Sequence, residues 1–439
     1  TPPEGEPVLR FHGERPRNVL MISIDTTRRD HVGSYSADGV MYTPFLEQLM
    51  TEGVRLDAHQ QCSDWTFAST SCTMGGRYAE ENGFIPVLIG SEQLPLPDGQ
   101  RTIATRLRDL GFATILISSN GWLSAEWNNV QGYDQAPFGG GGSATILMGN
   151  GLDLLNATVG SPLTVPDGGT QQPWLLHVHF VEPHPPYIPP DYYNGEEVTL
   201  PPLDPKYDLD TQPGQYDATD DWPTMSPEEQ DLLERHLRAR YHGELRYLDD
   251  QIRGMWDTLE AGGWLDDTLV VVWTDHGEQF WERGHQSHAW NLGAEENDGV
   301  AFFWGKNLIP YRWTEPTSAV DLLPTVLEAV GEPIDPLDPV LSGYVVGTAP
   351  EGRPRFSHSV ARAGVSQAVT LDDWKLVFNF NGTLHLYDRK ADPYELVDLY
   401  SPTHPQVAPL WALLRIRVER MHQLLPTRPL TWPVELPSL

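Results

Sequence analysis

Short, largely apolar runs alternate with stretches of helical periodicity along the first three quarters of the chain. Runs with the length of buried strands cover residues 17–24, 113–118, 174–180, 268–273 and 300–304. Apolar residues recur at helical spacing, with start and stop signals such as Pro and Gly, in residues 43–53, 102–111, 227–262 and 318–330. Strands that alternate with helices predict a mostly parallel sheet with helices on both faces.

After about residue 331 the pattern changes to shorter elements. Residues 374–378, 384–386 and 397–399 have the pattern of short strands, and residues 405–425 have that of an amphipathic helix. We therefore expect the α/β fold class, as an α/β/α sandwich with a mostly parallel central sheet. A small C-terminal α+β unit with an antiparallel sheet is expected to pack on it.

These patterns predict the domain boundaries. Residues 1–16 are expected to be an N-terminal linker or tether, residues 17–340 the main domain and residues 341–439 the C-terminal subdomain. Within the main domain, residues at about 191–224 are acidic and proline-rich, so we expect a surface insertion there. The polar start is typical of a mature chain whose signal peptide has been removed, which predicts an exported protein that is periplasmic, secreted or lipid-tethered. A truncated chain is the alternative.

The charge balance excludes some classes of partner. The chain has 29 basic and 61 acidic residues and a formal net charge of −32. A surface this acidic repels nucleic acid and anionic membranes, so no nucleic-acid partner is expected. No apolar run is long enough for a transmembrane helix. An anionic substrate would need a local positive centre, such as a bound metal ion.

Two cysteines, Cys62 and Cys72, lie close together in the sequence. In an exported protein they could form one disulfide, and two buried free thiols are the alternative. No further cysteine is present to complete a thiolate zinc site.

Acidic residues follow two of the predicted strands. Asp25 comes directly after residues 17–24, and Asp275 with His276 comes just after residues 268–273. The carboxyl ends of parallel strands meet at one edge of a sheet, where two carboxylates and an imidazole would bind a divalent cation. A strand-end Asp can instead cap a helix or form a salt bridge.

Four ordered segments resemble the signatures of the sulfatase family. They are VLMISIDTTRRDHVG at residues 19–33 with TPFLEQLMTEGV at 43–54, WTFASTSCTMGGRY at 65–78, TDHGE at 274–278, and WKLV…LHLYDRKADPYELVDLY at 374–400. The chain is thus similar to the sulfatase-like branch of the alkaline phosphatase superfamily. The resemblance implies an α/β fold and a metal-dependent hydrolase that acts on small anionic esters.

The second signature fixes the position of the nucleophile. In the family an Arg follows the nucleophile by eleven residues, and Arg77 stands eleven residues after Thr66. The resemblance therefore implies that Thr66 is the catalytic nucleophile. Family sulfatases carry Cys or Ser there, which is converted to formylglycine, and Ala68 and Thr70 replace the Pro and Arg of the motif. No formylglycine is expected. An N-cap of the following helix is the alternative role of Thr66.

Related phosphodiesterases use a threonine that also binds metal, beside Asp and an Asp-His pair. The resemblance implies that Asp25, Thr66, Asp275 and His276 are the metal ligands here. Thr26 replaces a second Asp of the sulfatase opening, and the loss of a carboxylate favours zinc or manganese over calcium.

Other polar residues match family positions that contact the substrate. His184 and His288 correspond to residues that bind the transferred group, and His285 lies close to His288 in the sequence. Asn120 lies where formylglycine sulfatases hold a Lys, and we expect it beside the substrate. A possible second metal site formed by Glu182, His184 and His288 is the rival role.

The expected function is hydrolysis of phosphodiester, phosphonate monoester or sulfate ester substrates through a covalent intermediate on Thr66. Trp122, Trp281 and Trp290 could form an apolar wall for the leaving group, and core packing is the alternative. The rival functions are a formylglycine-independent sulfatase, a phosphoryl or sulfuryl transferase, and an inactive binding protein on the same fold.

Overall fold

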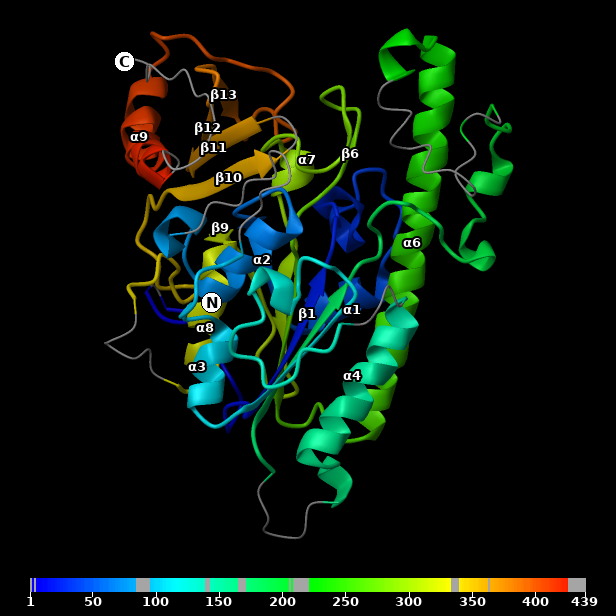
Figure 1. Ribbon diagram of the computed structural model, residues 1–439, viewed down its shortest axis with the longest axis vertical. Helices are drawn as coiled ribbons and strands as arrows, with labels where there is room; N and C mark the ends of the chain where they lie inside the picture. The colour runs from blue at the N-terminus through cyan, green and yellow to red at the C-terminus, as the bar shows by residue number, and fades with distance from the viewer. Residues whose placement is uncertain are drawn as a thin grey trace.

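The computed structural model of the 439-residue chain describes residues 2–3, 5–83, 95–138, 143–164, 171–204, 207, 221–332, 339–361 and 364–424. A seven-stranded sheet with the strand order β3-β4-β1-β5-β8-β2-β9 runs through its centre (Figure 1). Its strands are β1 (Asn18–Ile24), β2 (Val54–Gln60), β3 (Ala113–Ser118), β4 (Trp174–Phe180), β5 (Thr268–Thr274), β8 (Ala301–Trp304) and β9 (Tyr311–Ser318). Strand β8 is antiparallel to both neighbours, and the other pairs are parallel. The expected mostly parallel sheet is confirmed.

Helices cover both faces of this sheet. The helices of the main domain are α1 (Pro44–Glu52), α2 (Thr66–Gly75), α3 (Ile103–Asp109), α4 (Ala144–Val159), α6 (Pro227–Ala261) and α8 (Leu322–Ala329), with the short α7 (Ala294–Asn297) beyond the end of the sheet (Figure 1). Leu20 and Ile22 of β1 pack in a core with α1, α4 and α6, whereas Val19 and Met21 pack in a second core with α3 and α8 (Figure 1). Successive side chains of a strand point to opposite faces, so two cores form. The sandwich architecture is confirmed.

The C-terminal unit is a four-stranded antiparallel sheet with one helix packed on it. Its elements are β10 (Arg355–Ala361), β11 (Gly364–Leu371), β12 (Trp374–Asn379), β13 (Leu384–Asp388) and α9 (Val407–Leu424). The strand predicted at residues 397–399 is wrong. The Asp398 carboxylate accepts the backbone N–H groups of Leu386 and Tyr400, at 3.0 and 2.9 Å, and takes the place of a strand ladder there.

The stretch predicted as a linker, residues 1–16, packs against the main domain in its described part. Val8 and Leu9 are buried in the second core, and the Val8 N–H donates to the Val346 carbonyl at 2.9 Å. The described part of this segment is therefore packed on the main domain, and its role as a linker or tether stays a prediction. Its apolar residues explain the packing, because burying them removes apolar surface from water.

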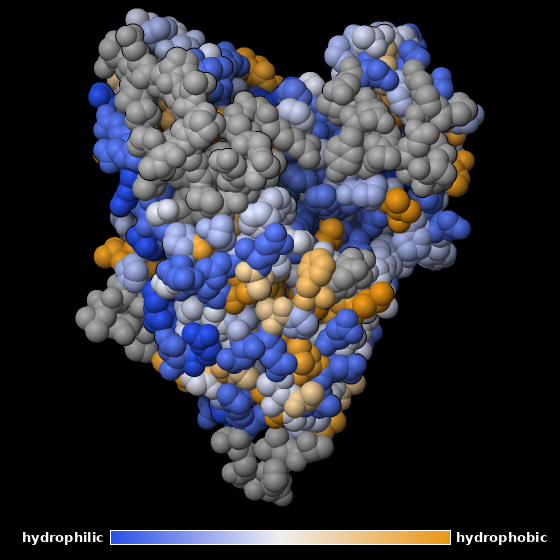
Figure 2. Space-filling model, viewed as in Figure 1, coloured by the Kyte–Doolittle hydropathy of each residue, from blue (hydrophilic) through white to orange (hydrophobic). Residues whose placement is uncertain are grey.

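The predicted insertion at about residues 191–224 lies against the N-terminal half of α6. Glu196 contacts His242 at 3.2 Å, and Glu197 contacts His236 at 3.0 Å. Two parts of the insertion lie outside the described residues, 205–206 and 208–220. This half of α6 and the C-terminal unit form two lobes with a hollow between them, and β1 points toward that hollow (Figures 1 and 2). Among the described residues, no helix combines the length and apolar character that crossing a membrane requires.

Candidate functional site

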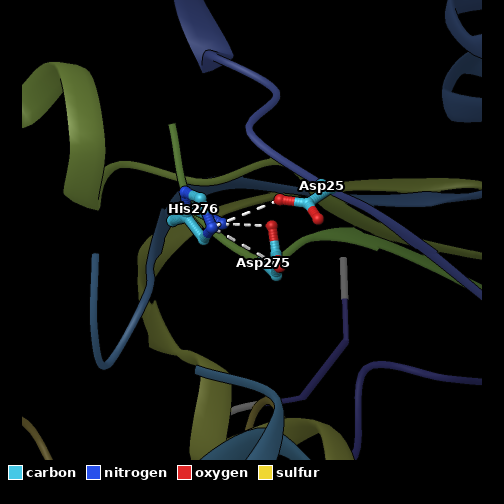
Figure 3. Close-up of side chains that lie close together, drawn as sticks. All are labelled: Asp25, Asp275 and His276. Atoms are coloured by element: carbon cyan, nitrogen blue, oxygen red, sulfur yellow. Dashed lines mark hydrogen bonds and ion pairs between the residues drawn. The ribbon is translucent and has the colours of Figure 1, made fainter. Parts of the chain in front are cut away.

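The site begins where two central strands end. Strands β1 and β5 pair in parallel with Ile24 opposite Thr274, so Asp25 and Asp275 emerge side by side. The backbone N–H of Asp275 donates to the Ile24 carbonyl at 3.0 Å, which extends the pairing to the site itself. Asp25, Asp275 and His276 are fully buried and point toward one another (Figure 3).

The chemistry of these three side chains fits a divalent cation. Their ligand atoms lie within 4.8 Å of one another, and no other such group of three or more occurs among the described residues. The Nδ1–H of His276 is directed at the Gly277 carbonyl at 2.9 Å, which leaves Nε2 facing the two carboxylates. An imidazole fixed in this way is typical of metal sites. Within the described part of the chain, Asp275 Oδ2 makes no hydrogen bond.

The electrostatics of the cluster also favour the binding of a positive charge between the carboxylates. Burial and the neighbouring Asp25 charge raise the pKa of Asp275 to about 6. Although burial alone lowers it, the two carboxylates raise the pKa of His276 to about 10. Burial likewise opposes the ionised form of Asp25, yet hydrogen bonds with His179 and His276 hold its pKa well below the usual range. Two carboxylates this close retain a proton on the imidazole unless a cation replaces it.

Thr66 is the first residue of α2, and its hydroxyl faces this cluster. Its Oγ1 lies 3.4 Å from each carboxylate oxygen of Asp25 and 3.4 Å from His276 Nε2. The N-cap of α2 is Trp65, so the alternative role of Thr66 as an N-cap is wrong. Among the described residues, no side chain caps the first turn of α2, whose N–H groups and dipole favour negative charge.

Asn120 reaches the site from the loop after β3. Its Nδ2 donates to Asp25 Oδ2 at 2.7 Å and lies 3.3 Å from Thr66 Oγ1. The Asn120 backbone N–H donates to the Ser118 hydroxyl at 3.0 Å, which holds the loop in place. Asn120 was expected at the substrate, whereas its amide contacts a candidate metal ligand and the candidate nucleophile.

His184 and His288 lie together beside His276. The ring centroids of His184 and His288 are 4.9 Å apart, and those of His276 and His288 are 4.5 Å apart. His288 Nδ1 lies 3.4 Å from the buried carboxylate of Glu278. The structure thus brings both histidines, which come from separate loops, to the candidate metal cluster.

Other predicted site residues lie elsewhere. The ring of His285 stacks on Trp290 with centroids 4.0 Å apart. Glu182 accepts the backbone N–H of Ala144 at 2.9 Å and so binds the N-terminus of α4. Among the described residues, Glu182, His184 and His288 do not form a group of side chains that could hold a metal ion.

One of the three predicted tryptophans packs next to the residues that flank Thr66, the candidate nucleophile. Trp122 packs edge-on against Trp65, with centroids 5.0 Å apart, and joins a cluster that includes Phe67. By contrast, Trp281 stacks on Trp222 at 3.9 Å. Trp122 is half-buried, and its ring packs on Trp65 and Phe67, the sequence neighbours of Thr66.

The cysteines, for which two states were open, form a disulfide between Cys62 and Cys72. Cys62 follows β2 and Cys72 lies in α2, so the bridge closes a short segment that includes Thr66, the first residue of α2. Helix α2 is also held next to the end of β5, because the Ser69 hydroxyl donates to the carbonyl of Asp275 at 2.5 Å.

Sequence reasoning missed His179. Its Nε2 lies 3.4 Å from Asp25 Oδ2, and the residue is fully buried in β4. A signal was present: His177 and His179 alternate in an otherwise apolar strand and therefore share one face of the sheet.

Comparisons with known proteins agree with this geometry. The family model described as Sulfatase matches residues 17–332. A choline-sulfatase from Rhizobium meliloti (strain 1021) is 28% identical over 250 residues, which cover 53% of this chain and 47% of the relative. The chain therefore spans about half the length of this curated relative.

Solved structures share the fold over nearly the whole chain. A phosphonate monoester hydrolase from Silicibacter pomeroyi has a TM-score of 0.69 at 21% identity, covering 93% of this chain and 96% of the other. A protein solved in complex with its substrate D-glucosamine-2-N,6-O-disulfate has a TM-score of 0.69 at 17% identity, covering 95% and 100%.

Proposed function

The chain belongs to the sulfatase family, and from this membership we propose that it is a metal-dependent ester hydrolase with Thr66 as its nucleophile. The observation that carries the proposal is the position of Thr66 Oγ1, within 3.4 Å of Asp25, His276 and Asn120. A hydroxyl held between carboxylate, imidazole and amide groups at a helix N-terminus is suited to attack on an anionic ester.

We assign the metal ligands as Asp25, Asp275, His276 and the Thr66 oxygen. A divalent cation bound there would lower the pKa of the hydroxyl and polarise an ester oxygen. The imidazole among the ligands favours zinc or manganese over calcium. Asn120 would orient Thr66 Oγ1, and His184 and His288 would hydrogen-bond to the non-bridging oxygens of the ester.

In the reaction, Thr66 Oγ1 would form a bond to sulfur or phosphorus while the bond to the leaving alcohol breaks. The resulting ester on Thr66 would then be hydrolysed by water, which restores the free hydroxyl. The dipole and the first-turn N–H groups of α2, which begins at Thr66, would favour the negative charge that develops near the Thr66 oxygen.

The neutral residues of the site favour esters with one negative charge. Thr70 turns back into α2, where its hydroxyl donates to the Thr66 carbonyl at 2.6 Å, and Asn120 carries no charge. Phosphonate monoesters, phosphodiesters and sulfate esters carry one charge near neutral pH. The names of the relatives, a choline-sulfatase and a phosphonate monoester hydrolase, support both sulfur and phosphorus esters as candidates.

The test combines a substrate panel with nucleophile variants. 4-Nitrophenyl sulfate, phosphonate, phosphodiester and phosphate esters are assayed with the chelated and the zinc- or manganese-loaded protein. Thr66→Ala should lower kcat by at least ~10³, since nucleophile and metal ligand are lost together. Thr66→Ser keeps the hydroxyl and is the matched control that should retain most of the activity. The proposal would be refuted if Thr66→Ala turned over substrate at the wild-type rate, or if the purified enzyme were active without bound metal.

We also propose that the protein is exported. The Cys62–Cys72 disulfide supports this, because disulfides persist mainly in oxidising compartments. Mass spectrometry of the thiol content of protein isolated from its native cells tests it.

A further inference from the structure

A row of buried hydrogen bonds runs from the candidate metal ligand Asp25 away from the site. His179 Nε2 lies 3.4 Å from Asp25 Oδ2, and His179 Nδ1 lies 2.7 Å from the Ser23 hydroxyl. The same hydroxyl lies 2.8 Å from His177 Nε2, and His177 Nδ1 lies 2.8 Å from the Tyr133 hydroxyl. Four consecutive contacts therefore connect Tyr133 to Asp25.

The parallel pairing of β1 and β4 produces this row. Ser23 stands opposite His179 in the register, and Met21 stands opposite His177. The two histidines lie two residues apart, so they share a face of the sheet with Ser23 between them. Ser23, His177 and His179 are at most 1% exposed, and the His177 ring packs on Trp273 with centroids 5.2 Å apart.

For two neutral imidazole rings, the acceptor at one end fixes the direction of every hydrogen bond in the row. An ionised carboxylate only accepts, so His179 must present Nε2–H to Asp25 and its Nδ1 must accept the Ser23 proton. The Ser23 oxygen then accepts Nε2–H of His177, whose Nδ1 accepts the Tyr133 proton. If the hydrogen bonds between neutral rings ran in the opposite direction, the unprotonated Nε2 of His179 would face the Asp25 carboxylate. Burial lowers the pKa of His177 to about 3, in accord with a neutral ring.

In this arrangement the two carboxylate oxygens of Asp25 have different partners. Oδ2 receives Asn120 Nδ2 at 2.7 Å and His179 Nε2 at 3.4 Å, whereas Oδ1 lies 3.3 Å from His276 Nε2. Donors on Oδ2 hold the carboxylate so that Oδ1 faces the cluster. Hydrogen-bond partners of metal ligands set ligand orientation and affinity in this way.

We propose that His179 is a positioning residue for the metal ligand Asp25, and that the row through Ser23, His177 and Tyr133 fixes the tautomer in which His179 donates. The inference rests on the proposed function, because it takes Asp25 as a metal ligand. His179 acts through Asp25 and has no part in the bond-making steps. Because each donor in the row polarises the next, loss of one link weakens the contact at Asp25.

The test measures metal binding instead of turnover. Full-length protein is stripped of metal and titrated with Mn²⁺ in a calorimeter. Ser23→Ala, which deletes one buried oxygen, and His179→Leu should each weaken Mn²⁺ binding by about 10- to 100-fold. His179→Gln places an amide N–H near the position of Nε2, so it should restore most of the lost affinity. In the His179→Gln background, Ser23→Ala should cause no further loss, since an amide has no tautomer to fix.

A matched control separates positioning from general destabilisation. Thr268 carries a buried hydroxyl at the opposite end of β5, and it donates to the Trp264 carbonyl at 2.6 Å. Thr268→Val should lower the melting temperature without changing Mn²⁺ affinity. Equal losses of affinity in Thr268→Val and Ser23→Ala would overturn the inference.

The proposed function and this inference fail in different ways. If wild-type protein binds no Mn²⁺ or Zn²⁺, or if Asp25→Asn binds as tightly as wild type, the metal assignment itself fails. If wild type binds and Asp25→Asn does not, while Ser23→Ala and His179→Leu bind normally, only the positioning role is overturned.

Discussion

Asn120→Ala removes one amide that contacts both the proposed metal ligand Asp25 and the proposed nucleophile Thr66. The amide is 8% exposed and donates to Asp25 Oδ2 at 2.7 Å. A hydrogen bond to a charged group contributes about 1.5–3 kcal/mol. Its loss should lower kcat/KM by about 10- to 150-fold, because 1.4 kcal/mol corresponds to a factor of ten.

The assay is turnover of a 4-nitrophenyl ester at saturating metal, with the metal affinity measured in parallel. If the amide acts mainly by orienting Thr66 Oγ1, kcat should fall even when the metal site is full. If it acts mainly through Asp25, added metal should recover much of the loss. Both routes predict a lower kcat/KM at limiting metal.

Asn129→Ala is the matched control in the same loop. The Asn129 amide donates to the Trp122 carbonyl at 2.6 Å, and no hydrogen bond of the structure joins it to Asp25 or Thr66. It should keep near-wild-type kcat/KM. Full activity of Asn120→Ala with its metal content intact, or an equal loss in Asn129→Ala, would refute the role drawn from the geometry.

For esters that share the same leaving group, kcat/KM should be highest for the phosphonate monoester or phosphodiester, lower for the sulfate ester and lowest for the phosphate monoester. The site lacks two cations of the family's sulfate site, and this loss should lower kcat/KM for a dianionic ester by ~10² or more. A phosphate monoester with the highest kcat/KM would contradict this. Cys72→Ser should lower the Tm of the oxidised protein, because a disulfide that closes a short segment such as residues 62–72 contributes about 2–3 kcal/mol to the free energy of unfolding. An unchanged Tm would show that the disulfide does not stabilise the protein. Burial lowers the pKa of His59 to about 3, so its contribution to stability is present above pH 6.5 and lost as pH falls from 6.5 toward 3. Relative to His59→Gln, wild type should lose about 1.4 kcal/mol of unfolding free energy per pH unit in that range, and parallel pH curves of the two proteins would rule it out.

The ends of β1 and β5 were predictable because a parallel sheet brings its carboxyl edges together. An apolar run followed by an acid specifies both the strand and the position of the acid, so Asp25, Asp275 and His276 could be placed from their sequence neighbours alone. The contacts of Asn120, by contrast, could not be predicted from its sequence neighbours. Asn120 lies two residues beyond β3, which is two strands away from β1, and it reaches Asp25 only because Ser118 holds the loop.

Glu182 and helix α4 show which contacts of the candidate site the sequence did not indicate. The α4 sequence, ATILMGNGLDLLNATV, contains Gly149 and Gly151, which are poor helix formers, and it was not predicted as a helix. The possible second metal site was suggested by the residue types alone, and the N-terminus of α4, which Glu182 contacts, was not visible in the sequence. Tertiary packing of an apolar face decided the local structure there, and such packing is not visible in periodicity alone.

The protein carries 32 excess negative charges, and yet its site is proposed to bind an anion. Arg28 stands only three residues after Asp25, but its guanidinium bonds to Asp30 at 2.8–2.9 Å and to Glu282. Since these acids engage Arg28, the attraction in our proposal comes from the metal, the histidine pair and the first turn of α2. These groups act over a short range, whereas the acidic surface repels anions generally once screening is low. Selection for esters with one charge therefore follows from the same balance, because each added negative charge on the substrate increases the repulsion and gains no further cation in the site.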